Sequence, residues 1–223
     1  MPTLFIDAET YSECDLKAVG AHRYARDPST QAILWSISSL EWEGTHVVET
    51  PSLWVALGHV GQRRGFRGSA SDPLFLIHWG AFDRLIAMYA SGTPLSDWAL
   101  EADPSLAAIP GPLHTYWCDL REVSLTYGGP GSLKDAALFW GGGVEQKAQG
   151  KSLISLFYKP QKDGTRARAE DHPEKWAQFV EYARQDTNVM RPIYESLLRV
   201  EGGHSMLDHW PAISLVRRMN ERG

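Results

Sequence analysis

The sequence has 223 residues, 43% of them hydrophobic and 22% charged, so it is long enough for one large domain or two small ones and has the composition of a soluble globular protein. Its formal net charge of −5 at pH 7 argues against wholesale electrostatic attraction to nucleic acid; binding would depend on local basic patches or on metal ions that screen phosphates. The two cysteines have no paired spacing, and no apolar stretch approaches the ~20 residues of a membrane span, which argues against a disulfide scaffold, a zinc site and a membrane protein.

The hydrophobic pattern predicts one α/β domain, in which a small mixed sheet forms early in the chain and helices pack around it later. In chain order, the predicted elements are a buried strand over 3–7, a helix over 15–26 capped by Ser12 or Asp15, a strand over 32–40, a hairpin turn at Gly44 into a strand over 45–49, a helix from 51–52 to about 64, a buried strand over 74–78, a helix over 81–91, short helices over 120–127, 133–140 and 153–158, a long helix from Pro173 to about Leu198 with Pro192 as a candidate kink, and a last helix over 205–220. The segments 63–71, 92–113 and 159–171 are predicted connections.

Two acids, Asp7 and Glu9, follow the first apolar run. Residues two apart in a strand point to the same face, so the two carboxylates are expected side by side. Their repulsion at neutral pH is commonly offset by a divalent cation. Taken alone, the pair fits a cation site and two solvated acids at the end of a strand equally well.

Three further residues add to this pair. Asp83 comes just after the strand over 74–78, and Tyr182 and Asp186 are four residues apart, which places them on one face of the long helix. Each of these residues alone would be read as a surface acid or a half-buried aromatic residue. Together, four carboxylates from three segments predict a site for two hard cations.

These motifs resemble the DEDD superfamily of 3′–5′ exonucleases, in the subclass that has the tyrosine. More closely, the chain is similar over essentially its whole length to the proofreading exonuclease domain of phage family-A DNA polymerases. The segments that carry the likeness are Phe5–Tyr11, Asp15-Leu16, Tyr24-Ala25, Asp27-Pro28, Pro130–Leu133, Gly150–Ile154, Pro173–Trp176 and Glu181–Asp186. The resemblance implies a ribonuclease-H-like fold, with a mixed sheet of about five strands flanked by helices.

The resemblance also implies the roles of the acids. Asp7 is expected to bridge two divalent cations, Mg²⁺ or Mn²⁺, which suit ligands that are all hard oxygens. Glu9 and Asp186 would complete the site of the attacking water, Asp83 would hold the second cation, and Tyr182 would orient the nucleophile. The implied reaction is hydrolysis of the terminal phosphodiester at a DNA 3′ end, with release of nucleoside 5′-monophosphates.

Five residues near these motifs are expected to contact the substrate: Thr10, Tyr11, His78, Trp79 and Phe82. Trp79 departs from the family, which usually has asparagine after the histidine; it would either stack on a terminal base or replace the asparagine as a packing residue. Two basic loops are candidate tracks for a single-strand backbone, although solvated loops are the default interpretation. Their basic residues are Arg63, Arg64 and Arg67 in the first, and Lys159, Lys162, Arg166 and Arg168 in the second.

The end of the chain, Arg217–Gly223, resembles the segment at which the polymerase module of such proteins begins. We therefore expect an exonuclease domain over 1–203, followed by a C-terminal helix over 204–223. That helix is either a junction to a polymerase in the same chain or a docking element for a separate polymerase subunit, unless it simply packs on its own domain. With no signal-peptide pattern at the start, a cytoplasmic location in a bacterial or phage-infected cell is expected.

Two other functions remain open from the sequence. A 3′–5′ exoribonuclease of the same fold would use the same acids, because discrimination between sugars depends on the shape of the pocket. A non-catalytic module that binds DNA or a polymerase is favoured only by Trp79.

Overall fold

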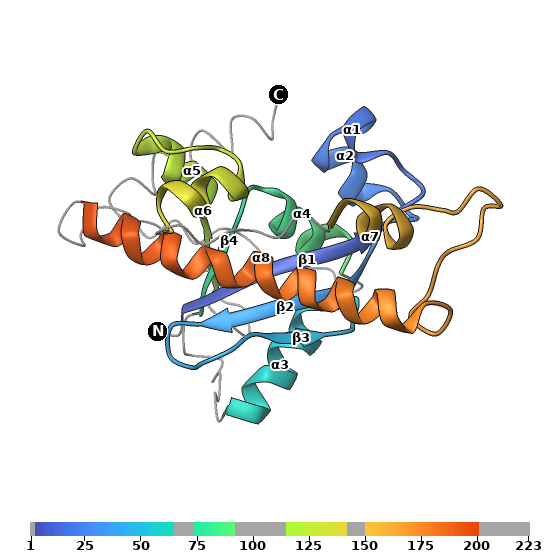
Figure 1. Cartoon of the computed structure of the whole chain (residues 1–223), viewed down its shortest axis with the longest axis horizontal. Helices are drawn as coiled ribbons and strands as arrows, with labels where there is room; N and C mark the ends of the chain where they lie inside the picture. Colours follow the sequence, from blue (N-terminus) through green and yellow to red (C-terminus); the bar gives the residue numbers. More distant parts are fainter. Residues whose placement is uncertain (1–2, 65–73, 92–114, 142–149, 201–223) are drawn as a thin grey trace.

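The computed structural model describes residues 3–64, 74–91, 115–141 and 150–200. The described strands form one five-stranded mixed sheet in the order β3-β2-β1-β4-β5 (Figure 1). The strands are β1 (Thr3–Tyr11), β2 (Gln31–Ser39), β3 (His46–Val48), β4 (Leu74–His78) and β5 (Thr115–Asp119). The helices are α1 (Leu16–Val19), α2 (Ala21–Arg26), α3 (Leu53–Arg64), α4 (Phe82–Tyr89), α5 (Leu120–Thr126), α6 (Leu133–Phe139), α7 (Gly150–Phe157) and α8 (Pro173–Val200). This architecture confirms the predicted α/β class.

Strand β1 lies at the centre of the sheet. It pairs antiparallel with β2 on one side and parallel with β4 on the other, and β4 pairs parallel with β5. Strand β3 extends the antiparallel side through β2, as the predicted hairpin requires. Because β1 is paired on both edges, the side chains that it carries have fixed positions within the sheet.

The alternation of side chains along β1 divides the core between the two faces of the sheet. Leu4, Ile6 and Ala8 belong to a buried cluster with residues of α2, α3 and α4. Phe5 points to the opposite face and packs in a second cluster with Val189 and other residues of α5, α6 and α8. The long helix α8, drawn orange to red in Figure 1, runs across that second face over β1 and β2.

The first 26 residues differ from the sequence prediction in three ways. Strand β1 continues to Tyr11, so Asp7 and Glu9 lie within the strand instead of at its end. The helix predicted over 15–26 is two short helices, because Gly20 between them has φ = 77°, which a helix cannot contain. Asp15 rather than Ser12 is the cap of α1, with its side chain accepting from the Lys17 amide.

Strand β5 was not among the elements predicted individually. It has five residues in the order Thr-Tyr-Trp-Cys-Asp, and its β-branched and aromatic residues were the available signal. Helix α7 begins at Gly150, three residues earlier than predicted, and α8 continues through Pro192 to Val200. The predicted helix over 205–220 and the loop centred on Arg67 lie outside the described residues. Among the described helices, none has the length and apolar character needed to cross a bilayer.

Candidate metal centre

The site is built where β1 and α8 face each other. Asp7 and Glu9 alternate with the buried Ile6 and Ala8, so they share the face of Phe5, which is the face that α8 covers. Helix α8 presents Asp186 to this face one turn after Tyr182. The sequence thus places two acids by strand alternation and a third by helical spacing, and packing of the helix on the sheet brings them together.

One carboxylate oxygen from each of Asp7, Glu9 and Asp186 lies within 4.8 Å of the other two. Glu9 is 1% exposed and Asp186 is 7% exposed, while Asp7 is partly exposed. Glu9 Oε2 is buried and has no hydrogen-bond partner among the described residues. A buried anionic oxygen without a partner is costly, and a divalent cation is the group that would offset this cost. The donor set, all carboxylate oxygens, fits Mg²⁺ or Mn²⁺.

Asp83 approaches the same centre from the first turn of α4. It is 3% exposed, and its Oδ1 accepts a hydrogen bond of 3.0 Å from the backbone N–H of Ala8. Ala8 lies between Asp7 and Glu9, so this bond fixes the start of α4 against the acidic part of β1. Asp83 is not one of the three acids whose oxygens meet within 4.8 Å, but it lies close enough to raise the pKa of Asp7 and Glu9.

The acids raise one another's pKa. Burial and then the charges of Asp83, Glu9 and Asp186 raise the pKa of Asp7 well above its ordinary value, and burial followed by Asp186 and Asp83 does the same for Glu9. Burial, with smaller contributions from Asp119 and Asp186, raises the pKa of Asp83 to about 8, although the bond from Ala8 opposes this rise. Raised pKa values of this kind favour the protonated carboxyl groups, and a bound cation favours the ionised ones.

Tyr182 stays protonated beside these acids. Its half-buried ring raises the pKa of the hydroxyl, and the charges of Asp186, Glu9 and Asp7 together with a hydrogen bond to Asp186 raise it further. A phenol held in this form is a hydrogen-bond donor at the acidic cluster over the whole physiological pH range.

Thr10 and Tyr11 were predicted to contact the substrate, and both are buried. The Thr10 hydroxyl shares a hydrogen bond of 2.9 Å with the Tyr24 hydroxyl, and Thr10 has no exposed surface. The Tyr11 ring is covered by the guanidinium of Arg166, which stacks 4.5 Å from the ring centroid. Their contact with a substrate stays a prediction, and in this structure they pack against the protein.

The three residues around the second motif also have defined surroundings. His78 is fully buried with its Nδ1 bonded to Gly80 O, and its ring packs edge-on against Trp117. Trp79 is half-buried against the cluster that contains Phe5 and Val189, which fits the interpretation of a packing residue. Phe82 is half-buried beside the ring of Tyr24. Substrate contact by these residues remains a prediction.

Asp119 is a supporting residue that the sequence reasoning missed. It is 3% exposed, and its Oδ1 accepts from the N–H groups of Gly80 at 2.8 Å and Arg121 at 3.1 Å. It therefore caps α5 and holds the turn between β4 and α4, the helix that carries Asp83. The signal was available, because an aspartate directly before a predicted helix is a common N-cap.

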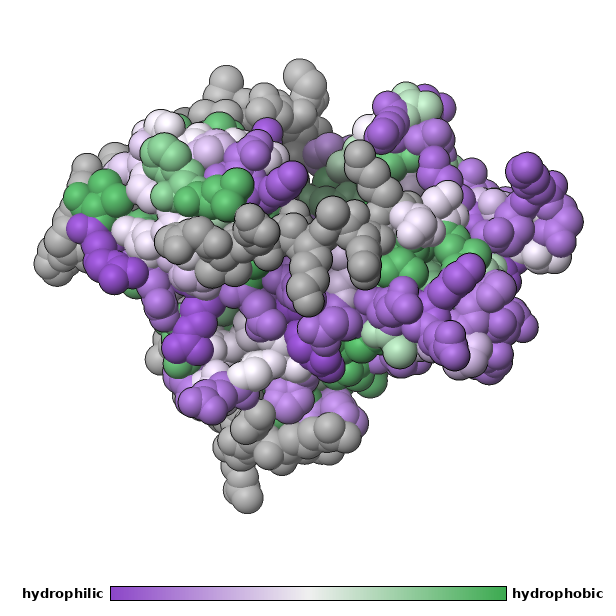
Figure 2. All heavy atoms as spheres, in the orientation of Figure 1, coloured by the Kyte–Doolittle hydropathy of each residue, from purple (hydrophilic) through white to green (hydrophobic). Residues whose placement is uncertain are grey.

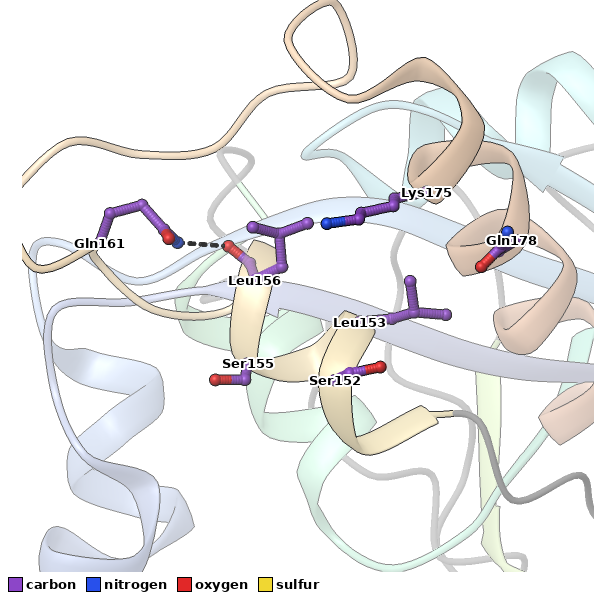
Figure 3. A pocket seen from close by; sticks show the side chains of 7 residues that line it. All are labelled: Ser152, Leu153, Ser155, Leu156, Gln161, Lys175 and Gln178. Carbon is purple, nitrogen blue, oxygen red and sulfur yellow. Dashed lines mark hydrogen bonds between the residues drawn. The ribbon is translucent and has the colours of Figure 1, made fainter.

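The basic loop between α7 and α8 lies at the hydrophilic end of the face seen in Figure 2. Lys159 forms an exposed ion pair of 3.6 Å with Asp15. Its contact with the backbone of a nucleic-acid strand stays a prediction. A pocket of about 270 Å³ lies between α7 and the first turns of α8 (Figure 3). Gln161 borders it and donates to Leu156 O, and none of the predicted site residues lines it. The acidic cluster is thus separate from this pocket.

Comparison with known proteins supports the resemblance drawn from the motifs. No protein-family model matches the sequence. The DNA polymerase of Bacillus phage SP02 is 25% identical over 230 residues, which cover all of this chain and 32% of the polymerase. Among solved structures, the catalytic core of RRP6 from Trypanosoma brucei matches with a TM-score of 0.51 and 15% identity over 95% of this chain and 45% of that one. A second structure of the same core, without the C496S substitution of the first, matches with a TM-score of 0.50 and 14% identity.

The two kinds of match have different weight. The structural match shows the fold, and the mixed sheet flanked by helices confirms the ribonuclease-H-like architecture. The likeness of the whole chain to about a third of a phage DNA polymerase bears out the resemblance to proteins of that kind. The chain spans about a third of the length of that polymerase and less than half of the RRP6 core.

Proposed function

We propose that this protein is a metal-dependent 3′–5′ exonuclease that trims single-stranded DNA ends to nucleoside 5′-monophosphates and proofreads for a family-A DNA polymerase. The observation that carries the proposal is the meeting of Asp7, Glu9 and Asp186 within 4.8 Å, with an oxygen of Glu9 left without a partner among the described residues. Three converging carboxylates, two of them buried, are unfavourable for stability, so a function that uses their charge accounts for them best.

Asp7, Glu9, Asp83 and Asp186 would hold two divalent cations, Mg²⁺ or Mn²⁺. When bound, the cations would lower the pKa of the attacking water and stabilise the negative charge on the attacking and leaving oxygens. They would also provide the positive field that a protein of net charge −5 lacks.

The remaining chemistry belongs to side chains of the protein. The Tyr182 hydroxyl, kept protonated by its acidic neighbours, would donate a hydrogen bond that orients the nucleophile. Asp83, tied to the Ala8 amide through one oxygen, would set the spacing between β1 and the start of α4. Thr10, Tyr11, His78, Trp79 and Phe82 are proposed to shape the surroundings of the terminal nucleotide, either by contact or through the packing described above.

DNA is the proposed substrate because the relative that matches over the whole of this chain is a DNA polymerase. A polymerase, in the same chain or as a separate subunit, is the proposed partner, and a bacterial or phage-infected cytoplasm the proposed location. The test for the partner is co-elution with a candidate family-A polymerase in size-exclusion chromatography, with nuclease activity measured on the same fractions.

The activity is tested with matched DNA and RNA oligomers labelled at the 5′ end, incubated with Mg²⁺ or Mn²⁺. We expect a ladder of products shortened from the 3′ end, faster on DNA, absent in EDTA and abolished by Asp7→Ala combined with Glu9→Ala. Retained activity in that double variant would refute the site. Faster trimming of RNA would establish the exoribonuclease alternative, and tight binding of either oligomer without cleavage would establish a non-catalytic module.

A further inference from the structure

Helix α7 contacts α8 at Tyr182, the residue proposed to orient the nucleophile. Along α7, Gly150, Leu153 and Phe157 are spaced i, i+3 and i+7 and share one face. Leu153 and Phe157 are buried against Phe179 of α8, so this face is the one that meets α8. Gly150, the first residue of α7, therefore lies where α7 passes the next turn of α8.

The approach at this point is closer than any side chain would allow. A Cβ atom at Gly150 would lie 2.4 Å from Cε2 of Tyr182, and 2.9 Å from both Cδ2 and Cζ of the same ring. Carbon atoms in contact are normally 3.5 Å or more apart, so even a methyl group would displace the ring by about 1 Å or push α7 away. The ring of Tyr182 thus lies directly against the backbone of α7.

The ring has little room to yield elsewhere. Tyr182 is half-buried and packs against the cluster that contains Tyr11, Phe179 and Ala183. Its hydroxyl lies at the acids, because it is hydrogen-bonded to Asp186, one turn further along α8, and Asp186 meets Asp7 and Glu9. A displacement at Cε2 is therefore transmitted to the hydroxyl, which lies on the same rigid ring.

We propose that Gly150 is a positioning residue for Tyr182: its missing side chain lets the ring lie against α7 and holds the hydroxyl at the acidic cluster. This inference rests on the proposed function for its effect on rate. For the geometry itself it rests only on the contact between Gly150 and Tyr182.

A double-mutant cycle separates positioning from simple packing. Gly150→Ala is made in the natural protein and in Tyr182→Phe, which keeps the ring and loses only the hydroxyl. In the natural background we expect kcat on a single-stranded DNA oligomer to fall by about 10–100-fold with KM nearly unchanged, because a misplacement of about 1 Å has an effect of this size. In the Tyr182→Phe background the same substitution is expected to lower kcat by less than about threefold, while the loss of thermal stability is the same in both.

The matched control is Gly58→Ala. Gly58 lies within α3, and a Cβ there would meet no atom within 4 Å. Its replacement is expected to leave kcat unchanged and stability unchanged or slightly higher. Equal losses of kcat from Gly150→Ala in both backgrounds would assign Gly150 to packing alone, and no loss in the natural background would also overturn the proposal.

A second readout does not depend on activity. With 3-fluorotyrosine incorporated at position 182, the ¹⁹F resonance reports the surroundings of the ring and their change when Mg²⁺ is added. Gly150→Ala is expected to move this resonance and reduce its response to Mg²⁺, and Gly58→Ala to leave both unchanged. An unchanged resonance in Gly150→Ala refutes the positioning role even if no oligomer is cleaved. A moved resonance in a protein without nuclease activity would keep the positioning role and reject the proposed function.

Discussion

Glu9 is the residue that most clearly distinguishes a cation site from a set of surface acids. It is 1% exposed, its Oε2 has no hydrogen-bond partner among the described residues, and two other carboxylates lie within 4.8 Å of it. In an ordinary fold an acid in this position would be replaced by a neutral residue, because its charge opposes folding. The carboxylate is explained if its charge serves to bind a cation.

Glu9→Gln tests this explanation. The amide has the same volume and no charge, so we expect the metal-free protein to be as stable as the natural one or more stable, and its affinity for Mn²⁺ to fall by about tenfold or more. Thermal melts and calorimetric titration with Mn²⁺ measure the two effects. Glu181→Gln is the control, since it removes an exposed charge that pairs with Arg184 on the same helix and should alter neither. Weaker folding with unchanged Mn²⁺ affinity would contradict the explanation.

Asp119 has a structural role at the same end of the sheet. It joins the N–H groups of Gly80 and Arg121 through one oxygen, so Asp119→Ala is expected to cost about 1–3 kcal/mol of unfolding free energy. Asp119→Asn keeps an oxygen in that position and should cost less. Urea denaturation measures both, and equal losses in the two variants would show that these hydrogen bonds are not the cause.

At the scale of the elements, α7 and the first half of α8 form a unit held by aromatic side chains. Phe179 has no exposed surface, and its ring lies 5.1 Å from that of Phe157 and 5.5 Å from that of Trp176. The unit carries Tyr182 on α8 and Gly150 on α7, so the packing of these two helices sets the geometry at the acidic cluster.

Phe179→Ala is expected to destabilise the protein by about 3–5 kcal/mol, because it opens a cavity at the contact between the helices. Phe179→Leu, which fills most of that volume, should cost clearly less. Denaturant unfolding gives both values. A loss of less than about 1 kcal/mol in Phe179→Ala would mean that this cluster does not hold α7 on α8.

The elements also show what sequence can and cannot predict here. Strand alternation placed Asp7 and Glu9 on one face, and helical spacing placed Tyr182 one turn before Asp186; both follow from local geometry and both are confirmed. Two other contacts depend on how elements distant in the sequence pack, which local patterns in one sequence do not predict. They are the hydrogen bond from Ala8 to Asp83 and the contact of Gly150 with Tyr182. Strand β5 was missed because five residues after a long connection give no periodic signal.

At the scale of the whole molecule, the acidic centre links stability to pH. Burial raises the pKa of Asp83 to about 8 from an ordinary value of 3.8, so between these values the folded state holds a proton that the unfolded state has lost. Stability of the metal-free protein should therefore fall as pH rises from about 4 to about 8. Asp7 and Glu9, whose pKa values are also raised, act in the same direction.

Divalent cations should reverse this trend. They bind the ionised carboxylates, so Mg²⁺ or Mn²⁺ should raise the melting temperature more at about pH 8 than at about pH 5. Melting curves in EDTA and in excess cation at the two pH values make the comparison, and Asp7→Asn with Glu9→Gln is the control in which the difference should shrink. A cation effect that is equal at both pH values would place binding away from these acids.

We propose that Asp7, Glu9, Asp83 and Asp186 form one divalent-cation centre. The most direct measurement is anomalous X-ray scattering from crystals grown with Mn²⁺ at a concentration that supports cleavage of DNA in solution. We predict manganese peaks bounded by the carboxylates of Asp7, Glu9 and Asp186, with a second ion reaching Asp83. Ordered crystals in which these four carboxylates carry no manganese peak would refute this cation centre.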